Sequence, residues 1–190
     1  MVNRRYLFIE GAKDTTNGDL REGFGKLLEK KIKGKMPRIS MGEGKLQTIN
    51  KFKNSDDSKL LCDLDRHSSY IVTDLNEYDL NSKKESVFYM IQEMEAWFIS
   101  QPALLDKFYG SQISNKLAIK PATEVSEPDK ELQRITKDTK KGTYHKIRHG
   151  AELLKLLDVN KLSNDFPDFK RLVECLQYST DANRVDGRSS

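Results

Sequence analysis

The alternation of short apolar runs with helical patterns is the feature of this sequence that most restricts its fold. Residues 6–9 (Tyr-Leu-Phe-Ile) form a continuous apolar run with aromatic and β-branched members, which is typical of a buried strand. Comparable runs predict strands at 37–41, 69–73 and 87–91. Segments of helical character lie between and after them, at 20–32, 46–53, 93–99 and 102–109. This order predicts an α/β fold of the Rossmann-like kind, with a mostly parallel central sheet flanked by helices.

The character of the chain changes near residue 110. Residues 111–128 contain two prolines and many Ser, Asn and Thr residues, which favours an irregular connector. Three further helices are predicted after it, at 128–138, 144–157 and 166–177. We therefore expect three parts, namely an α/β core over 1–110, a C-terminal helical lobe packed on that core over 111–180, and a flexible tail over 181–190.

Composition excludes several classes of protein. The 190 residues match the size of one domain, or of one domain with an appended lobe. The 33 basic and 29 acidic residues exclude both an acidic tail and a histone-like chain. Cys62 and Cys175 are too few for a disulfide framework or a zinc cluster, and their leucine neighbours predict small buried thiols. No apolar run is long enough for a membrane span or a signal peptide, so we expect a cytoplasmic protein.

Carboxylates follow three of the predicted strands. Glu10 comes after 6–9, Asp74 after 69–73, and Glu93 and Glu95 after 87–91. In an open parallel sheet ligands bind outside the carboxyl ends of the strands, so these acids converge if the strands are neighbours. Clustered carboxylates repel one another unless a cation neutralises them, and oxygen ligands suit Mg²⁺ or Mn²⁺. The alternative is that each acid only marks the point at which a strand meets solvent.

A basic segment lies at residues 137–150. If a helix begins near Thr143, its free N–H groups and positive dipole end favour phosphate binding. The residues predicted to contact phosphate are Lys13, Lys140, Lys141, His145, Lys146, Arg148 and His149. His145 and His149 lie four residues apart on one helical face, where they could contact a phosphate or move a proton. The alternative is a solvated basic surface.

Two other segments carry weaker signals. Residues 42–45 (Gly-Glu-Gly-Lys) are similar to a phosphate loop, but Ile39 and Leu46 stand where that motif needs glycine and Ser or Thr. Trp97 and Phe98, which invite interpretation as an aromatic box, are predicted to be core residues instead.

Several motifs together resemble the bacterial family called domain of unknown function 4276. They are Glu10-Gly11 after a strand, the 92–98 segment (Gln-Glu-Met-Glu-Ala-Trp-Phe), the 102–110 segment and the 141–150 segment. That family is similar to the Toprim fold, in which a Glu after the first strand and an Asp-x-Asp after a later strand bind Mg²⁺ for nucleic-acid phosphoryl transfer. The resemblance implies a Toprim-like core with Glu10 as the first acid, Asp74 as the second and Glu95 as a further candidate. The sequence departs from the pattern at Asn76, where an amide replaces the second Asp.

The resulting hypothesis is a Mg²⁺- or Mn²⁺-dependent nuclease. The predicted catalytic residues are Glu10, Asp74, Glu95, His145 and Lys146. The predicted metal ligands are Glu10, Asp74, Asn76, Glu93 and Glu95. The resemblance also implies a role in phage defence beside an ATPase partner protein. Two alternatives stay open: a non-catalytic partner or regulator of such a complex, and a plain nucleic-acid-binding module.

Overall fold

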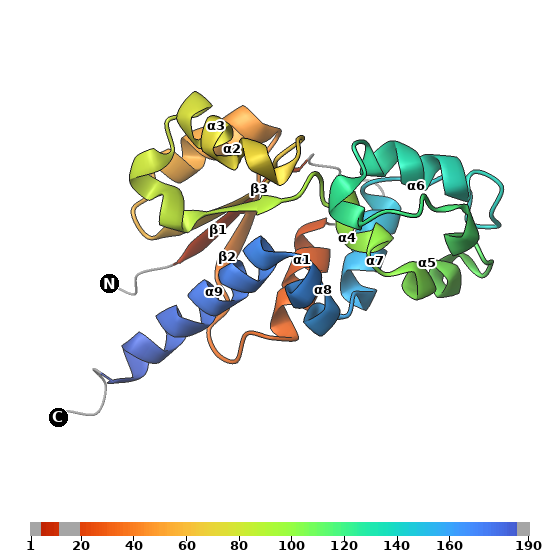
Figure 1. Cartoon of the computed structure of the whole chain (residues 1–190). Coiled ribbons are helices and arrows are strands. Elements are labelled where there is room, and N and C mark those ends of the chain that lie inside the picture. Colours follow the sequence, from red (N-terminus) through yellow and green to blue (C-terminus); the bar gives the residue numbers. More distant parts are fainter. Residues whose placement is uncertain (1–4, 12–19, 186–190) are drawn as a thin grey trace.

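The protein contains a parallel four-stranded sheet in the strand order β2-β1-β3-β4 (Figure 1). The computed structural model describes residues 5–11 and 20–185. The strands are β1 (Tyr6–Ile9), β2 (Arg38–Met41), β3 (Ser58–Asp63) and β4 (Val87–Met90). Each neighbouring pair is parallel. The prediction of an α/β fold with a parallel sheet flanked by helices, consistent with a Rossmann-like or Toprim-like arrangement, is confirmed.

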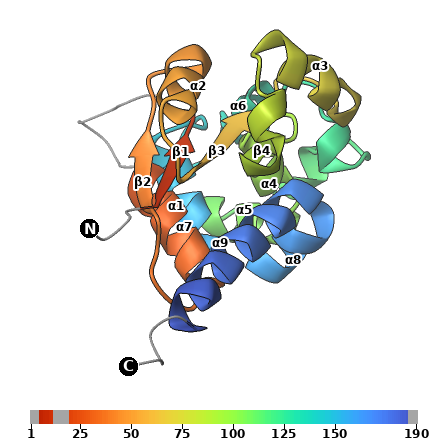
Figure 2. The ribbon, with the colours of Figure 1, turned by 90° about the vertical axis from the view of Figure 1, so that its left-hand side faces the viewer.

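Helices cover both faces of this sheet (Figures 1 and 2). In the first half of the chain they are α1 (Leu20–Glu29), α2 (Lys45–Lys53), α3 (Ile71–Glu77), α4 (Glu95–Ile99) and α5 (Pro102–Tyr109). In the second half they are α6 (Pro128–Thr136), α7 (Arg148–Leu156), α8 (Val159–Asp165) and α9 (Pro167–Val185). Short 3-10 turns at Ser68–Tyr70, Asn81–Ser86, Ser114–Lys116 and Ala122–Glu124 join them.

Side chains of successive strand residues point to opposite faces of the sheet and so divide the core in two. On one face Phe8, Leu60 and Cys62 pack with residues of α2 and α3. On the other, Leu7 and Leu61 belong to a larger cluster that includes residues of α1, α4, α7, α8 and α9. The C-terminal helices therefore share one core with the sheet.

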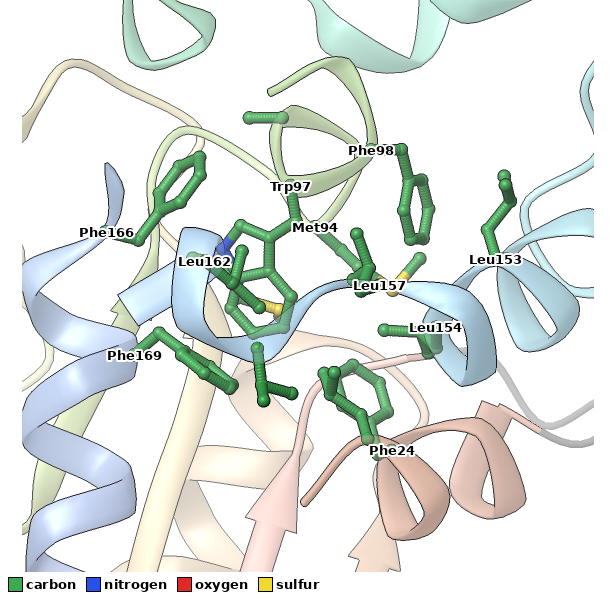
Figure 3. Close-up of a cluster of buried hydrophobic side chains, with 14 of the residues drawn as sticks. Phe24, Met94, Trp97, Phe98, Leu153, Leu154, Leu157, Leu162, Phe166 and Phe169 are labelled. Atoms are coloured by element: carbon green, nitrogen blue, oxygen red, sulfur yellow. The ribbon is translucent and has the colours of Figure 1, made fainter. Parts of the chain in front are cut away.

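Trp97 lies at the centre of the larger cluster (Figure 3). Its ring meets the edges of Phe24, Phe166 and Phe169 at centroid distances of 5.2–6.3 Å. Phe98 is fully buried as well. The prediction that Trp97 and Phe98 are core residues is therefore confirmed.

The outer edge of β4 is closed by side chains of α9. The backbone N–H of Tyr89 donates to Asp168 Oδ2 at 2.8 Å, and the Arg171 guanidinium donates to the carbonyl oxygen of Val87. These bonds satisfy main-chain groups that an edge strand otherwise leaves open. They also fix the C-terminal helix against the sheet.

One strand predicted from the sequence is wrong, and one strand of the structure was not predicted. Residues 69–73, predicted as a strand, form a 3-10 turn and the start of α3. Their burial follows a helical period, because Ile71, Asp74, Leu75 and Tyr78 are the residues of this helix and its cap that face inward. The missing strand is β3, in which all residues but one are buried. Its short apolar run is flanked by charged residues, which masked it in the sequence.

Smaller differences concern the C-terminal half and the cysteines. The predicted helix 144–157 begins only at Arg148, and α8 was not predicted. Cys62 is buried as predicted, whereas Cys175 is only partly buried and packs against the larger cluster. Within the described residues, no helix combines the length and apolar character that crossing a membrane requires.

Candidate carboxylate site

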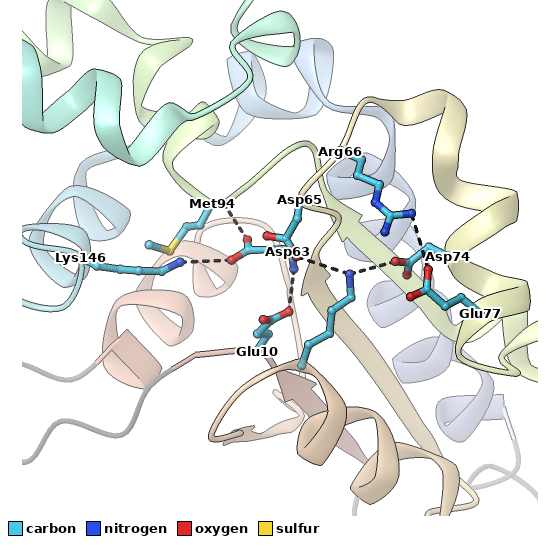
Figure 4. A network of polar contacts seen from close by, with 9 residues as sticks. Glu10, Asp63, Asp65, Arg66, Asp74, Glu77, Met94 and Lys146 are labelled. Carbon is cyan, nitrogen blue, oxygen red and sulfur yellow. Dashed lines mark hydrogen bonds and ion pairs between the residues drawn. The ribbon is translucent and has the colours of Figure 1, made fainter.

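Two neighbouring strands deliver acids to the same edge of the sheet. Glu10 directly follows β1, and Asp63 is the last residue of β3 (Figure 4). The backbone N–H of Glu10 donates to the carbonyl oxygen of Leu61 at 3.0 Å, and that of Asp63 donates to Glu10 Oε2 at 3.2 Å. Asp65, two residues further on, has a left-handed backbone (φ 60°) and an exposed side chain. The carboxyl ends of β1 and β3 thus hold a cluster of Glu10, Asp63 and Asp65.

An Asp-x-Asp sequence, Asp63-Leu64-Asp65, begins at the last residue of β3. The sequence interpretation had placed the pair at Asp74 and Asn76. The signal that could have found it is the spacing itself, since Asp63 and Asp65 flank Leu64 directly after the apolar run 60–62. It was missed because β3 was missed.

Two further acids approach the cluster from the segment that follows β4. Glu95, the first residue of α4, is fully buried; its Oε1 accepts a hydrogen bond from the Tyr144 hydroxyl at 2.9 Å. Glu93 is half-buried. Glu93 Oε2 and Glu95 Oε2 are both buried and accept no hydrogen bond from the protein. Such oxygens are costly to bury and mark a place where a cation would be favoured.

The pKa values of these carboxyls reflect burial and mutual repulsion. Burial, followed by the charges of Asp63 and Asp65, raises the pKa of Glu10 to about 7. Burial also raises the pKa of Asp63. The pKa values of Glu93 and Glu95 are raised to about 7, chiefly by burial. Clusters of carboxyls with raised pKa values are more frequent at functional sites than elsewhere.

Two lysines compensate part of this negative charge. Lys146 Nζ lies 3.2 Å from Asp63 Oδ2 and 3.7 Å from Glu95 Oε2. Burial acts to lower the pKa of Lys146, but the charges of Asp63 and Glu95 outweigh it and the pKa is raised. Lys45, the first residue of α2, lies 3.0 Å from Asp74 Oδ1 and 3.6 Å from Asp65 Oδ2. One lysine therefore stands on each side of the cluster.

The predicted ligands Asp74 and Asn76 do not come from a strand end. Asp74 is a buried residue of α3 and forms its ion pair with Lys45. Asn76 is exposed, and its amide oxygen accepts a hydrogen bond from Asn81 at 2.7 Å. The convergence expected for Asp74 is instead provided by Asp63.

The predicted phosphate-contacting residues that the structure describes divide into three groups: exposed, facing the carboxylates, and buried. Lys140, Lys141, His145 and Arg148 are exposed, and Lys146 faces the carboxylates. His149 is buried: its Nδ1 accepts from the backbone N–H of His145 at 3.2 Å and lies 3.1 Å from the Tyr109 hydroxyl. Lys13 lies outside the described residues.

The ring of His145, which precedes α7, caps the first residue of that helix. The backbone N–H of Arg148 donates to His145 Nδ1 at 3.3 Å. Burial, followed by the charge of Arg148, lowers the pKa of His149, which favours a neutral ring in the core. The helix end is therefore less open to an anion than the sequence predicts. Lys140 and Arg148 are exposed, and the Lys141 ammonium group lies 4.6 Å from the centre of the Phe108 ring.

The carboxylates of the cluster are chemically suited to a divalent cation, but their side chains do not converge on one point. Carboxylate oxygens are the ligands that Mg²⁺ and Mn²⁺ favour. Among residues 5–11 and 20–185, no three His, Cys, Asp or Glu side chains are disposed so as to hold a metal ion. Asp63 and Asp65 are instead engaged by the lysine ammonium groups. Loading of a cation would have to displace at least one of them.

Fold and site together define a Rossmann-like α/β protein with a carboxylate cluster at the carboxyl ends of its central strands. A family model described as domain of unknown function (DUF4276) matches residues 20–177, and the chain belongs to that family. Comparisons with curated proteins and with solved structures gave no match.

Proposed function

We propose that this protein is a Mg²⁺- or Mn²⁺-dependent phosphodiester hydrolase that acts on nucleic acid. The observation that carries the proposal is that Glu10 and Asp63 adjoin at the ends of two neighbouring parallel strands, with Asp65 two residues further on and the buried Glu95 linked to Asp63 through Lys146. When bound, a divalent cation stabilises the attacking and leaving oxygens of phosphoryl transfer. Glu10, Asp63 and Asp65 are the residues that would hold it.

Tyr144 and Lys146 orient the acids of the site and neutralise part of their charge. The Tyr144 hydroxyl fixes one oxygen of Glu95 and leaves the other without a hydrogen bond. Lys146 bridges Asp63 and Glu95 and is 42% exposed, so its ammonium group can also meet a phosphate. The exposed Lys140, Lys141 and Arg148 add positive charge in the segment that carries Lys146. From the family resemblance we add phage defence as the process and an ATPase as the partner protein.

Cleavage assays test this proposal directly. Labelled DNA and RNA are incubated with the purified protein, with and without Mn²⁺, beside the variants Glu10→Gln and Asp63→Asn. We expect Mn²⁺-dependent cleavage that both variants lose. The matched control is Glu85→Gln, which changes an exposed glutamate in the turn before β4 and should cleave normally. Cleavage that is equal in Glu10→Gln would refute the assigned site.

A second candidate is a non-catalytic partner or regulator that keeps the fold. The pairing of Asp63 with Lys146 and of Asp65 with Lys45 favours it, because two protein cations already neutralise the Asp-x-Asp pair. Failure to cleave any substrate, even together with a copurified partner, would support this candidate. Nucleic-acid binding that falls steeply with salt but is independent of metal would support a plain binding module.

A further inference from the structure

Lys45 occupies a position that helix energetics oppose. It is the first residue of α2, directly after Gly44, whose φ of 94° turns the chain into the helix. A cation in the first turn of a helix faces the positive end of the helix dipole. The loop is nevertheless held in place, since the N–H of Gly44 donates to the carbonyl oxygen of Gly11, just after β1. The fold thus fixes an unfavourable charge beside the carboxylate cluster.

Asp74 is the group that holds Lys45. It is 2% exposed, and its Oδ1 accepts from Lys45 Nζ at 3.0 Å. Its second oxygen, Oδ2, is buried without a hydrogen-bond partner. The aromatic ring of Tyr78, the cap of α3, lies 5.3 Å from the same ammonium group. Asp74 and Tyr78 therefore define where the Lys45 ammonium stands.

The same ammonium group reaches the carboxylates. Lys45 Nζ lies 3.6 Å from Asp65 Oδ2, and Asp65 is 56% exposed, so this contact lies at the surface of the site. Lys45 is 13% exposed and is paired more closely with the buried Asp74 than with Asp65. The fold therefore places a positive charge, held by one buried carboxylate, beside the carboxylate cluster.

We propose that Lys45, positioned by Asp74, is a phosphate-binding residue of this site that also acts as its counterion when no metal is bound. This inference rests on the proposed function. In the metal-free protein the Lys45 ammonium neutralises Asp65. With a divalent cation on Glu10, Asp63 and Asp65, that contact is released and the ammonium contacts a non-bridging phosphate oxygen of the nucleic acid. Asp74 is a positioning residue and not a metal ligand.

The test measures binding rather than turnover alone. Mn²⁺ affinity is measured by titration calorimetry, and binding of a fluorescein-labelled DNA oligonucleotide is measured in the presence of Ca²⁺. Lys45→Met should bind Mn²⁺ about threefold to tenfold more tightly, because a competing positive charge is gone, and should bind the oligonucleotide about tenfold more weakly. Asp74→Asn should shift both affinities in the same directions by less. Lys51→Met, which changes an exposed lysine of the same helix, is the matched control.

The outcomes separate this inference from the proposed function. If Glu10→Gln loses Mn²⁺ binding while Lys45→Met equals Lys51→Met in both affinities, the role of Lys45 is refuted and the metal site stands. If Asp74→Asn loses Mn²⁺ binding as completely as Glu10→Gln does, Asp74 is a ligand and the inference is wrong. If the unchanged protein binds no Mn²⁺, the proposed function and the inference fail together. Where cleavage is measurable, Lys45→Met should raise KM more than it lowers kcat.

Discussion

Replacing Glu10 by glutamine should stabilise the metal-free protein at alkaline pH. The folded protein raises the pKa of Glu10 from 4.5 to about 7, first through burial and then through the charges of Asp63 and Asp65. The folded state therefore holds this proton more tightly than the unfolded state does. The resulting stability is complete below about pH 4.5 and is lost as the pH rises through about 7. Glutamine has the same shape and no charge, so it removes this loss.

The magnitude follows from the size of the pKa change. At about 1.4 kcal/mol for each pH unit, a rise from 4.5 to about 7 corresponds to at most about 3.5 kcal/mol. Part of the rise comes from repulsion by Asp63 and Asp65, and the contributions of neighbouring charges are not additive. We therefore expect Glu10→Gln to increase the unfolding free energy by about 1–3 kcal/mol at about pH 8. For a chain of this length each kcal/mol moves Tm by about 2–4 °C.

The assay is thermal and urea unfolding in EDTA, at about pH 5.5 and about pH 8. The difference in unfolding free energy between Glu10→Gln and the unchanged protein should grow by about 1–2 kcal/mol between these two pH values, because part of the loss is already present one pH unit above the unfolded pKa. Glu85→Gln, an exposed control, should show no such growth. A Glu10→Gln variant whose stability follows the unchanged protein at both pH values would refute the reasoning that Glu10 is held in a repulsive, buried cluster.

Three further predictions concern packing, the buried glutamate and nucleic-acid binding. Gly23→Ala should destabilise the protein by about 1–3 kcal/mol in urea unfolding, because its new Cβ would lie 2.9 Å from the Ala151 carbonyl oxygen, where α1 packs on α7. The control is Gly25→Ala, whose new Cβ would have its nearest contact at 3.9 Å; it should be neutral or stabilising by up to about 1 kcal/mol. Equal effects of the two substitutions would contradict this packing. Tyr144→Phe should lower the unfolding free energy by about 1–3 kcal/mol at about pH 8 and by less at about pH 5.5, because the Tyr144 hydroxyl stabilises the ionised form of Glu95 more than the protonated form. An equal loss at both pH values would contradict this hydrogen bond. Arg148→Ala should reduce the steepness of the plot of log DNA affinity against log salt concentration by about 1. An unchanged slope would show that Arg148 does not contact a phosphate of the DNA.

Three of the four strands and the acid after the first strand could be predicted from the sequence, because β1 and β4 are unbroken apolar runs and Glu10 follows β1 directly. The third strand could not. Residues 69–73 have higher strand propensity than 58–63, yet tertiary packing buries one side of Ile71–Glu77 as a helix. Because of that single error, Asp74 replaced Asp63 as the predicted strand-end acid, and the Asp63-Leu64-Asp65 sequence was overlooked. Nor did the sequence indicate that Lys45 lies beside the cluster, because its ion pairs are with Asp65 and Asp74, which are 20 or more residues away in the sequence.

The fate of His149 illustrates a second limit of sequence reasoning. Its spacing from His145 predicted a shared face on one helix, but α7 begins only at Arg148. The ring of His145 caps Arg148, and the ring of His149 accepts from the backbone N–H of His145. Helix boundaries are the least certain part of any pattern. A shift of a few residues converted an expected phosphate ligand into a buried core residue beside Tyr109.

The central claim, that the strand-end carboxylates hold a divalent cation, is tested most directly by a crystal structure determined with Mn²⁺ and anomalous diffraction. The account predicts anomalous density in contact with Glu10, Asp63 and Asp65, with Asp65 turned away from Lys45 and with Lys45 still paired to Asp74. Density centred on Asp74 and Asn76, or an Mn²⁺-soaked crystal in which both lysines keep their carboxylates and the cluster carries no density, would contradict it.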